Sequence, residues 1–366
     1  MDRALEEGNK LKISVVRPGE LGPGEIAVWL SMQRQTPALA NPFLCPDFTV
    51  AAGALRPSAR VAVLHDGPHL AGFFPFERRG LSAGVPIGHG LSQRQGLIHA
   101  PGAEWDPKAL LRACRLSAWQ FDNLVPGQQP FGRFATEVVP VAAVDLARGF
   151  AQYEEELQQK SGKFYREIKR KTRRLEEEVG KVHFVADSRD KATLHNLVNW
   201  KSEQLRQKGA LDIFTRPWIT GLLDQLFSIK ADHFSMPLSV LYAGDTPVSS
   251  TVNLRSGDLL VGWHCAYNPQ FAHYSPGLMQ HIAMFRDAAI AGVRQIDMGT
   301  GPETFKRTLK THDVFVGAGT AAASPAVGAA HRARAAATLW VRGQVKRYPP
   351  LFRAADLVLR QTGRIG

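Results

Sequence analysis

Cysteine is scarce in this 366-residue chain, which holds only Cys45, Cys114 and Cys265. The three lie far apart, and no two have the CxxC spacing of a zinc site or a redox pair. Isolated thiols argue against a disulfide framework. We therefore expect neither a disulfide-stabilised domain nor a structural zinc site, and we predict no bound metal.

The sequence also lacks a long hydrophobic run. No uninterrupted apolar stretch approaches the roughly 18 residues that a membrane-spanning helix needs. The first twelve residues are charged and lack the apolar core of a signal peptide. Hydrophobic residues make up 44% of the chain and charged residues 21%, which is ordinary for a globular protein. We expect a cytoplasmic protein whose length fits two domains better than one.

Acidic residues are nearly absent from two basic segments. Residues 160–174 contain eight Lys or Arg against the single acid Glu167, and residues 326–366 contain eight against Asp356. The net charge of the whole chain is +12, so the remainder is slightly acidic. The pattern predicts two local contacts with phosphates, nucleic acid or an anionic membrane surface, rather than a general polyanion binder. A solvated helix face is the alternative for either segment.

Hydrophobic periodicity predicts alternating strands and helices. In order, the predicted elements are strands at 61–67 and 69–77, a helix at 106–119, a strand at 138–147, a helix at 161–179, a strand at 181–187, helices at 191–209 and 216–229, strands at 237–244, 247–256 and 258–267, a helix beginning at 275, and a strand at 294–299. A strand, a glycine-containing turn and a second strand occur at both 64–77 and 241–254. This recurrence suggests a tandem repeat of one domain type.

The most informative segment runs from 259 to 306, where a predicted strand leads through a loop into a helix. The loop meets the helix at Ser275-Pro276-Gly277. Serine is a good N-cap, and proline suits the first helical turn because its missing N–H would be unpaired there. The free N–H groups and the positive dipole end of such a helix can hold an anion. The segment predicts either a phosphate or pyrophosphate site or a plain helix cap, which needs the same residues.

Several stretches of the sequence resemble one known group of enzymes. WKSEQLR (200–206), AYNPQFAHYSPG (266–277) and IDMGTGPETFKRTL (296–309) are similar to the CelD/BcsL-type acetyltransferases of bacterial polysaccharide biosynthesis, a branch of the GNAT superfamily. NPFLCPDF (41–48) in the first half carries the same resemblance. This branch is related to the Fem-type aminoacyltransferases, which have two GNAT-like lobes.

The resemblance implies an α/β (α+β) fold of tandem GNAT-like lobes, each a mixed, mostly antiparallel sheet flanked by helices. We place the lobes at 1–150 and 151–320, followed by a basic helical tail at 321–366. The implied activity is transfer of an acetyl or other acyl group from acyl-CoA. The implied acceptor is a hydroxyl or amine of a small-molecule or glycan precursor of a polysaccharide or the cell envelope.

Candidate catalytic residues lie on and after the lobe's expected fourth and fifth strands. A neutral histidine at His264 suits a general base, Asp297 ends a strand, and Lys306 can neutralise a phosphate or an oxyanion. The GNAT resemblance implies that Tyr267, or alternatively Tyr274, protonates the leaving thiolate. Each of these residues also has a purely structural alternative. The histidine would be a core residue, the aspartate a turn cap, the lysine a solvated surface residue and the tyrosine a buried residue.

The resemblance also implies where the substrates bind. In GNAT enzymes the fourth and fifth strands splay apart and the pantetheine arm of coenzyme A lies in the gap. The expected donor-binding residues are Cys265 and Ala266, through their backbone N–H groups, and Tyr274, Ser275 and Gly277. Helical spacing, by contrast, places Trp200, Lys201 and Gln204 one turn apart, where they are expected to line the acceptor cleft or to form a core stripe. Arg166 and Arg170 of the basic segment and Glu303 complete the expected acceptor-binding residues, with a solvated face as the alternative for the arginines.

Two alternative functions remain open. The loop FAHYSPG has one glycine, Gly277, where the common GNAT motif has Q/R-x-x-G-x-G/A. A Fem-type transferase that uses aminoacyl-tRNA is therefore a competitor, and tRNA is the one nucleic acid partner that we expect under it. The third possibility is a non-catalytic GNAT scaffold in a polysaccharide-synthase complex.

The basic C-terminal tail is a candidate docking element. Residues 331–360 are Ala-rich, with scattered Leu, Trp and Val among the basic residues. Such a composition suits an interfacial helix pair on anionic lipid, or packing on the protein body or on a synthase complex. We expect a cytoplasmic protein that is peripheral at the inner face of the membrane.

Overall fold

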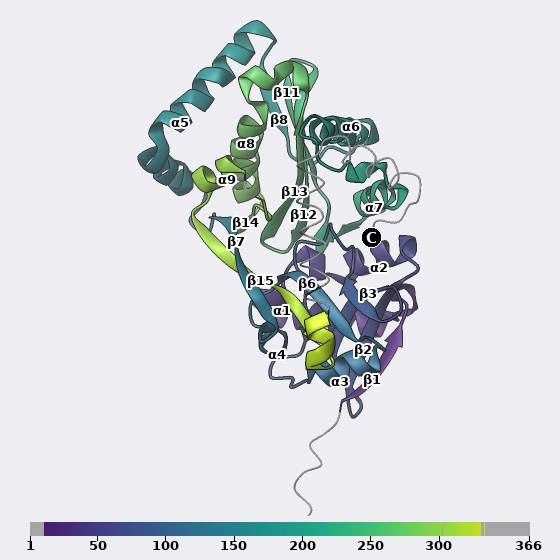
Figure 1. Cartoon of the computed structure of the whole chain (residues 1–366). Helices are drawn as coiled ribbons and strands as arrows, with labels where there is room; N and C mark the ends of the chain where they lie inside the picture. Colours follow the sequence, from purple (N-terminus) through teal and green to yellow (C-terminus); the bar gives the residue numbers. More distant parts are fainter. Residues whose placement is uncertain (1–10, 302, 331–332, 334–366) are drawn as a thin grey trace, which may run out of the picture. The chain divides into compact units, whose positions relative to one another are not determined.

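The computed structural model describes residues 11–301, 303–330 and 333, which form two compact units (Figure 1). Unit 1 takes the described residues up to 139 and from 315 onward, and unit 2 is Pro140–Val314. The chain crosses between the units inside two strands, β7 (Ala135–Asp145) and β15 (His312–Ala322). The predicted limits of 150 and 320 differ from these crossings, which lie after residues 139 and 314. Of the predicted tail at 321–366, Ala321 and Ala322 belong to β15 and residues 325–330 are helical, whereas residues 331–332 and 334–366 lie outside the described residues.

The elements of unit 1 precede β7 in the chain. They are β1 (Lys12–Val16), η1 (Pro18–Glu20), α1 (Pro23–Gln35), η2 (Pro37–Leu39), η3 (Pro42–Leu44), α2 (Pro46–Leu55), β2 (Ala59–Asp66), β3 (His69–Arg79), β4 (Ala83–Pro86), β5 (Ile98–His99), α3 (Pro107–Ala113), β6 (Ala118–Leu124) and α4 (Gln129–Gly132).

The elements of unit 2 lie between β7 and β15. They are α5 (Phe150–Glu178), β8 (Val182–Val185), α6 (Lys191–Gln207), η4 (Ile213–Thr215), α7 (Pro217–Ser228), β9 (Lys230–Ala231), β10 (Phe234–Ser235), β11 (Leu238–Ala243), β12 (Thr246–Ser256), β13 (Leu259–Tyr267), η5 (Pro269–Tyr274), α8 (Pro276–Ile290), β14 (Gln295–Asp297) and α9 (Thr304–Leu309).

The two units repeat one sheet plan. The strand order is β1-β2-β3-β4-β6-β15 in unit 1 and β8-β11-β12-β13-β14-β7 in unit 2. In both orders the first three pairings are antiparallel, the fourth is parallel and the fifth is antiparallel. In both, two α-helices lie between the first and second strands. The tandem repeat suggested by the sequence is therefore present at the level of topology.

The matching hairpins share a local irregularity as well. β2 and β3 shift register between Leu64 and His65, and β11 and β12 shift between Leu241 and Tyr242. Each shift lies just before the turn glycine that the sequence marked. A bulge increases local twist and fixes register, so the same device shapes the same hairpin in both units.

Each sheet is completed by a strand from the other half of the sequence. β7 pairs with β14 through Asp145, Val144 and Ala143. β15 pairs with β6, with Ala322 opposite Ala118. No pattern in the sequence indicated this exchange, because an isolated apolar run does not specify which strand it pairs with.

Two predicted helices have different limits in the structure. The predicted helix at 106–119 ends at Ala113, and its last two residues belong to β6, where Trp119 is fully buried. The predicted helix at 161–179 begins earlier, at Phe150, and Ser161 interrupts it with non-helical backbone angles. The sequence pattern located only the part of α5 that follows this kink.

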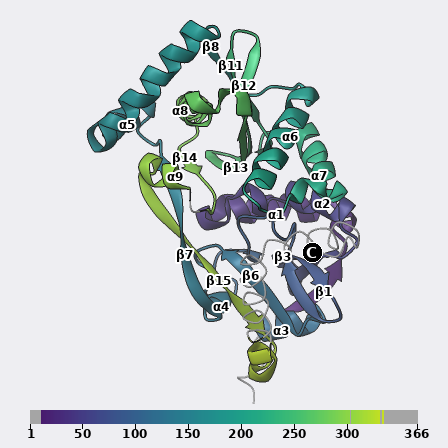
Figure 2. The same cartoon turned by 45° about the horizontal axis from the view of Figure 1, so that its top comes forward.

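The sheet of unit 2 has helices on both faces. Figures 1 and 2 place α5 and α8 on one face and α6 and α7 on the other. Tyr153 and Leu157 of α5 and Phe285 of α8 pack in one buried cluster with the sheet residues Val144 and Ile296. Within the described part of the chain, no helix has the length and hydropathy to cross a bilayer.

Candidate donor and acceptor site

The site is built where β13 and β14 diverge. Their parallel ladder has three pairs, from Leu259 opposite Gln295 to Val261 opposite Asp297. β14 ends there, whereas β13 continues to Tyr267. One edge of β13 is thus left without β14 as a partner, and the splay that the family resemblance implied is present.

The alternation of β13 decides which backbone groups face the gap. The N–H of Asn268 donates to the carbonyl of Val248 on β12 at 3.0 Å. In an antiparallel pair every second residue points its N–H and C=O at the partner strand. Ala266 therefore faces β12, and Cys265 and Tyr267 face the gap. Of the two backbone N–H groups that were predicted to polarise the acyl carbonyl, that of Cys265 points into the gap and that of Ala266 points at β12.

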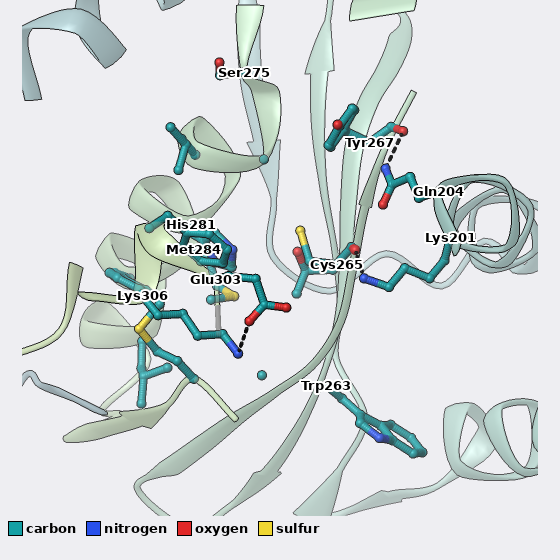
Figure 3. A pocket seen from close by; sticks show the side chains of 18 of the residues that line it. Lys201, Gln204, Trp263, Cys265, Tyr267, Ser275, His281, Met284, Glu303 and Lys306 are labelled. Atoms are coloured by element: carbon teal, nitrogen blue, oxygen red, sulfur yellow. Dashed lines mark hydrogen bonds and ion pairs between the residues drawn. The ribbon is translucent and has the colours of Figure 1, made fainter. Parts of the chain in front are cut away.

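A cavity of about 340 Å³ occupies this gap. Side chains of α6, β13, α8 and the segment 298–306 line it (Figure 3). Tyr267 and Gly277 are among the lining residues, whereas Tyr274 is not. Tyr274 is buried and its hydroxyl donates to Glu178. Tyr267 is therefore the tyrosine that the structure places beside the gap.

The start of α8 opens onto the cavity beside a lysine. Pro276 is the first helical residue, as predicted. Ser275 holds the N-cap position with a left-handed φ of 61°, but its side chain makes no capping hydrogen bond. Its hydroxyl instead accepts from Lys171 Nζ of α5 at 2.8 Å. The sequence was right about the helix start and wrong about the capping hydroxyl.

Two polar side chains of α6 reach the open edge of β13. Lys201 Nζ donates to the carbonyl of Cys265 at 3.0 Å, and Gln204 Nε2 donates to that of Tyr267 at 3.3 Å. Both line the cavity, whereas the neighbouring Trp200 does not. Asp190 starts this helix by accepting from the N–H groups of two first-turn residues. A capped, well-defined start sets which residues of α6 face β13.

The opposite wall carries an ion pair. Lys306 Nζ lies 3.0 Å from Glu303 Oε2 and also donates to the carbonyls of Gly299 and Thr300, each at 3.1 Å. The Lys306 side chain is 12% exposed and that of Glu303 is 46% exposed. Partial burial is the largest single influence on Glu303 and opposes its ionisation. The charge of Lys306, hydrogen bonds to the carboxylate and the charge of Lys201 together outweigh it and lower the pKa of the carboxyl.

His281 is a cavity residue that the sequence analysis missed. It lies on α8, stacks on Phe305 at 4.9 Å and is 9% exposed. Its Nδ1 is buried without a hydrogen-bond partner among the described residues. Burial, with help from the charge of Lys306, lowers its pKa to about 4. A signal was available, because residue 281 follows Gly277 by four positions and so shares its helix face.

Four other predicted site residues lie outside the cavity lining. His264 is buried on β13 and packs edge-on against Phe214 at 5.2 Å, as in its core alternative. Asp297 Oδ1 accepts from the N–H of Gly299 at 2.9 Å, as in its turn-capping alternative. Arg166 is exposed, and Arg170 makes a bidentate contact with Glu167 at 2.9 and 2.7 Å.

The two buried histidines make stability depend on pH. Burial lowers the pKa of His264 to about 3, whereas an unfolded histidine titrates near 6.5. The unfolded chain therefore binds more protons, and stability falls as pH falls from about 6.5 towards 3. We expect His264→Gln to reduce the slope of unfolding free energy against pH by about 1.4 kcal/mol per pH unit between about pH 5.5 and 4. Urea unfolding across this range measures both slopes, and identical slopes would show that folded His264 takes up a proton.

Comparison with known proteins agrees with this geometry. Residues 162–307 match the family model described as an acetyltransferase (GNAT) domain. No curated protein matches the sequence. FemX is similar over 84% of this chain and 96% of its own, at 10% identity and a TM-score of 0.53. The C-terminal (DUF2156) domain of a candidate lysylphosphatidylglycerol synthetase from Agrobacterium fabrum is similar over 85% and 96%, at 11% identity and a TM-score of 0.52.

Residues 162–307, less than half of the chain, thus match a GNAT acetyltransferase domain, and the predicted fold class, mixed α/β with tandem GNAT-like lobes, is confirmed. A GNAT domain implies acyltransferase chemistry with an acyl-CoA co-substrate. The residues at the gap fit such a molecule: Gly277 leaves space at the helix start, Lys171 lies beside it, and His281 presents an unpartnered buried nitrogen. In the described part of the chain, no cluster of three or more His, Cys, Asp or Glu is arranged to hold a metal ion.

The equivalent gap in unit 1 is closed by the chain itself. β4 and β6 pair only at Ala83 and Gly84. Farther along β6, Gln95 donates its N–H to the carbonyl of Asn123 at 2.9 Å and accepts from the N–H of Val125 at 3.0 Å. A segment after β4 therefore occupies the edge that stays open in unit 2.

Proposed function

We propose that this chain transfers an acetyl or other acyl group from acyl-CoA to a hydroxyl or amine of a polysaccharide-related or cell-envelope precursor. The observation that carries the proposal is the open edge of β13, with a cavity beside it and the start of α8 at its rim. The acceptor class follows the resemblance to CelD/BcsL-type enzymes. The reaction would take place in the cytoplasm, at or near the inner face of the membrane.

On the donor side, the start of α8 offers the backbone N–H of Gly277 and a positive dipole end, since Pro276 has no N–H and that of Leu278 donates to the Ser275 carbonyl at 3.0 Å. Lys171 adds a cation at Ser275. Together they suit the pyrophosphate of coenzyme A. The pantetheine arm would then follow the open edge of β13, and the N–H of Cys265 would polarise the acyl carbonyl as charge develops on its oxygen.

Two side chains would move the protons. His281 is neutral at pH 7, and its free Nδ1 would accept the proton of the attacking amine or hydroxyl. As the new C–N or C–O bond forms, the C–S bond breaks, and Tyr267 would protonate the leaving thiolate. The lowered pKa makes His281 a weak base, which suits an amine that arrives neutral. Lys306 is held by Glu303 and two carbonyls, so we assign it a positioning role on this wall.

Calorimetry with desulfo-coenzyme A and acetyl-CoA tests the donor assignment. We expect saturable one-site binding of both in the micromolar range, and slow release of free coenzyme A from acetyl-CoA when acceptor is added. Absence of binding at high micromolar concentration would contradict the proposal. It would leave the Fem-type transferase and the non-catalytic scaffold in a polysaccharide-synthase complex.

A Fem-type transferase that uses aminoacyl-tRNA is the second candidate, and one feature favours it. The exposed surface of α5 carries Lys163, Arg166, Lys169 and Arg173. Binding of tRNA through these cations would weaken steeply with salt, because each neutralised phosphate releases counterions. Filter binding of bulk tRNA at salt concentrations from roughly 50 to 200 mM measures this dependence of affinity on salt and separates the two candidates. Salt-dependent tRNA binding without coenzyme A binding would favour the Fem-type reaction.

A further inference from the structure

The charges that line the cavity do not balance. Three lysines line it, Lys201, Lys208 and Lys306, and Glu303 is the one carboxylate among the described lining residues. Glu303 is taken by Lys306 at 3.0 Å. His281, the histidine that lines the cavity, is kept neutral by burial and carries no negative charge. The cavity therefore has an excess of positive charge on the α6 wall.

Lys201 is partly buried and is the less exposed part of that excess, because Lys208 is exposed. The Lys201 ammonium has three N–H donors, and among the described residues the structure gives it one acceptor, the carbonyl of Cys265. A carbonyl dipole compensates a buried charge only in part. Burial accordingly lowers the pKa of Lys201. The other titratable groups that act on it are Cys265, Lys208, Glu303, Lys306, His264 and His281.

Lys201 does not lie where the donor's phosphates are expected. The anion site at the start of α8 is served by Lys171 on one face of the sheet. Lys201 reaches the gap from α6, on the other side of β13 (Figure 3). A molecule that enters from the α6 side meets this ammonium beside the backbone N–H of Cys265, where the acyl carbonyl is expected.

We infer that the acceptor is a carboxylate-bearing sugar of about monosaccharide size, and that Lys201 Nζ pairs with its carboxylate. This rests on the proposed function. A cavity of about 340 Å³ admits the thioester end of the donor and one small acceptor. A single lysine with two free donors suits one carboxylate, whereas phosphate esters are usually held by several cations or by a helix start. Pairing also reduces the cost of a partly buried charge that has no counter-ion.

Matched acceptors test the inference on the full chain with acetyl-CoA as donor. D-glucuronate is compared with D-glucose for transfer to a hydroxyl, and muramate with D-glucosamine for transfer to an amine. In one pair or both, we expect the acid to have a kcat/KM at least tenfold above its neutral partner. Lys201→Gln should bring that ratio close to one, and Lys201→Arg, which keeps the charge, should restore part of it. Lys191→Gln, at an exposed position on the same helix, is the matched control and should keep the wild-type ratio.

The outcomes separate this inference from the proposed function. Desulfo-coenzyme A binding with equal rates for acid and neutral partners, or with no turnover of either acid, overturns the inference and leaves the donor assignment standing. A preference for the acids that survives Lys201→Gln also overturns it. Failure to bind desulfo-coenzyme A contradicts the proposed function, and the inference is then overturned as well because it rests on that function.

Discussion

Replacement of Gly277 by tryptophan is expected to lower the affinity for desulfo-coenzyme A at least a hundredfold, or about 2.7 kcal/mol. Gly277 lies in the first turn of α8 and lines the cavity. A Cβ added there would lie 3.7 Å from Tyr267 Cδ1 and 4.0 Å from Cys265 Sγ. An indole extending from this point would occupy the space assigned to the donor. Calorimetry of the wild-type and variant proteins measures the loss.

Gly277→Ala separates the effect of size from the effect of losing glycine. Its Cβ makes only ordinary contacts, and the position does not require a left-handed backbone. Alanine also has the higher helix propensity. We expect this variant to keep most of the affinity. A folded tryptophan variant that binds as tightly as the wild type would place the donor elsewhere.

Substitution of His281 by glutamine is expected to lower kcat by about 10² to 10⁴, the range typical of a lost general base. Donor binding should change little, because the substitution keeps a polar group of similar size. With a pKa of about 4, the imidazole is neutral above about pH 5. Protonation of His281 should therefore lower the kcat/KM of the wild type only as pH falls through about 4. A pH profile of kcat/KM measures this.

His264→Gln is the matched control for His281→Gln. The same chemical change is then made on β13, at a buried histidine that does not line the cavity. We expect kcat to stay within a few-fold of wild type, with circular dichroism confirming the fold. A large loss of kcat in the control and none in His281→Gln would return the role of base to His264.

Local chemistry made part of this site predictable. Ser275-Pro276-Gly277 marks a helix start because proline's missing N–H and fixed φ act on adjacent residues only. The apolar pattern along 258–267 predicted β13, because such a pattern also acts over a few adjacent residues. The direction of the Ser275 hydroxyl was not predictable, because it depends on Lys171, a residue more than one hundred positions away.

Residue type alone did not distinguish the two buried histidines. A histidine on the strand at His264 and a histidine on the helix at His281 look alike in sequence, and each is a suitable base. The packing of Phe214 against one and the opening of the gap beside the other distinguish them. The buried, unpartnered Nδ1 of His281 is visible only once the surrounding residues are in place.

The sequence by itself determined the order of most helices and strands, the hairpin that recurs in both halves, and the helix start at Pro276. These follow from periodicity, turn chemistry and capping, which act over a few residues. Only the tertiary structure decided the exchange of β7 and β15 and the meeting of Lys201 with Cys265. Each of these joins residues that are distant in the chain, and their pairing depends on packing that no local pattern encodes.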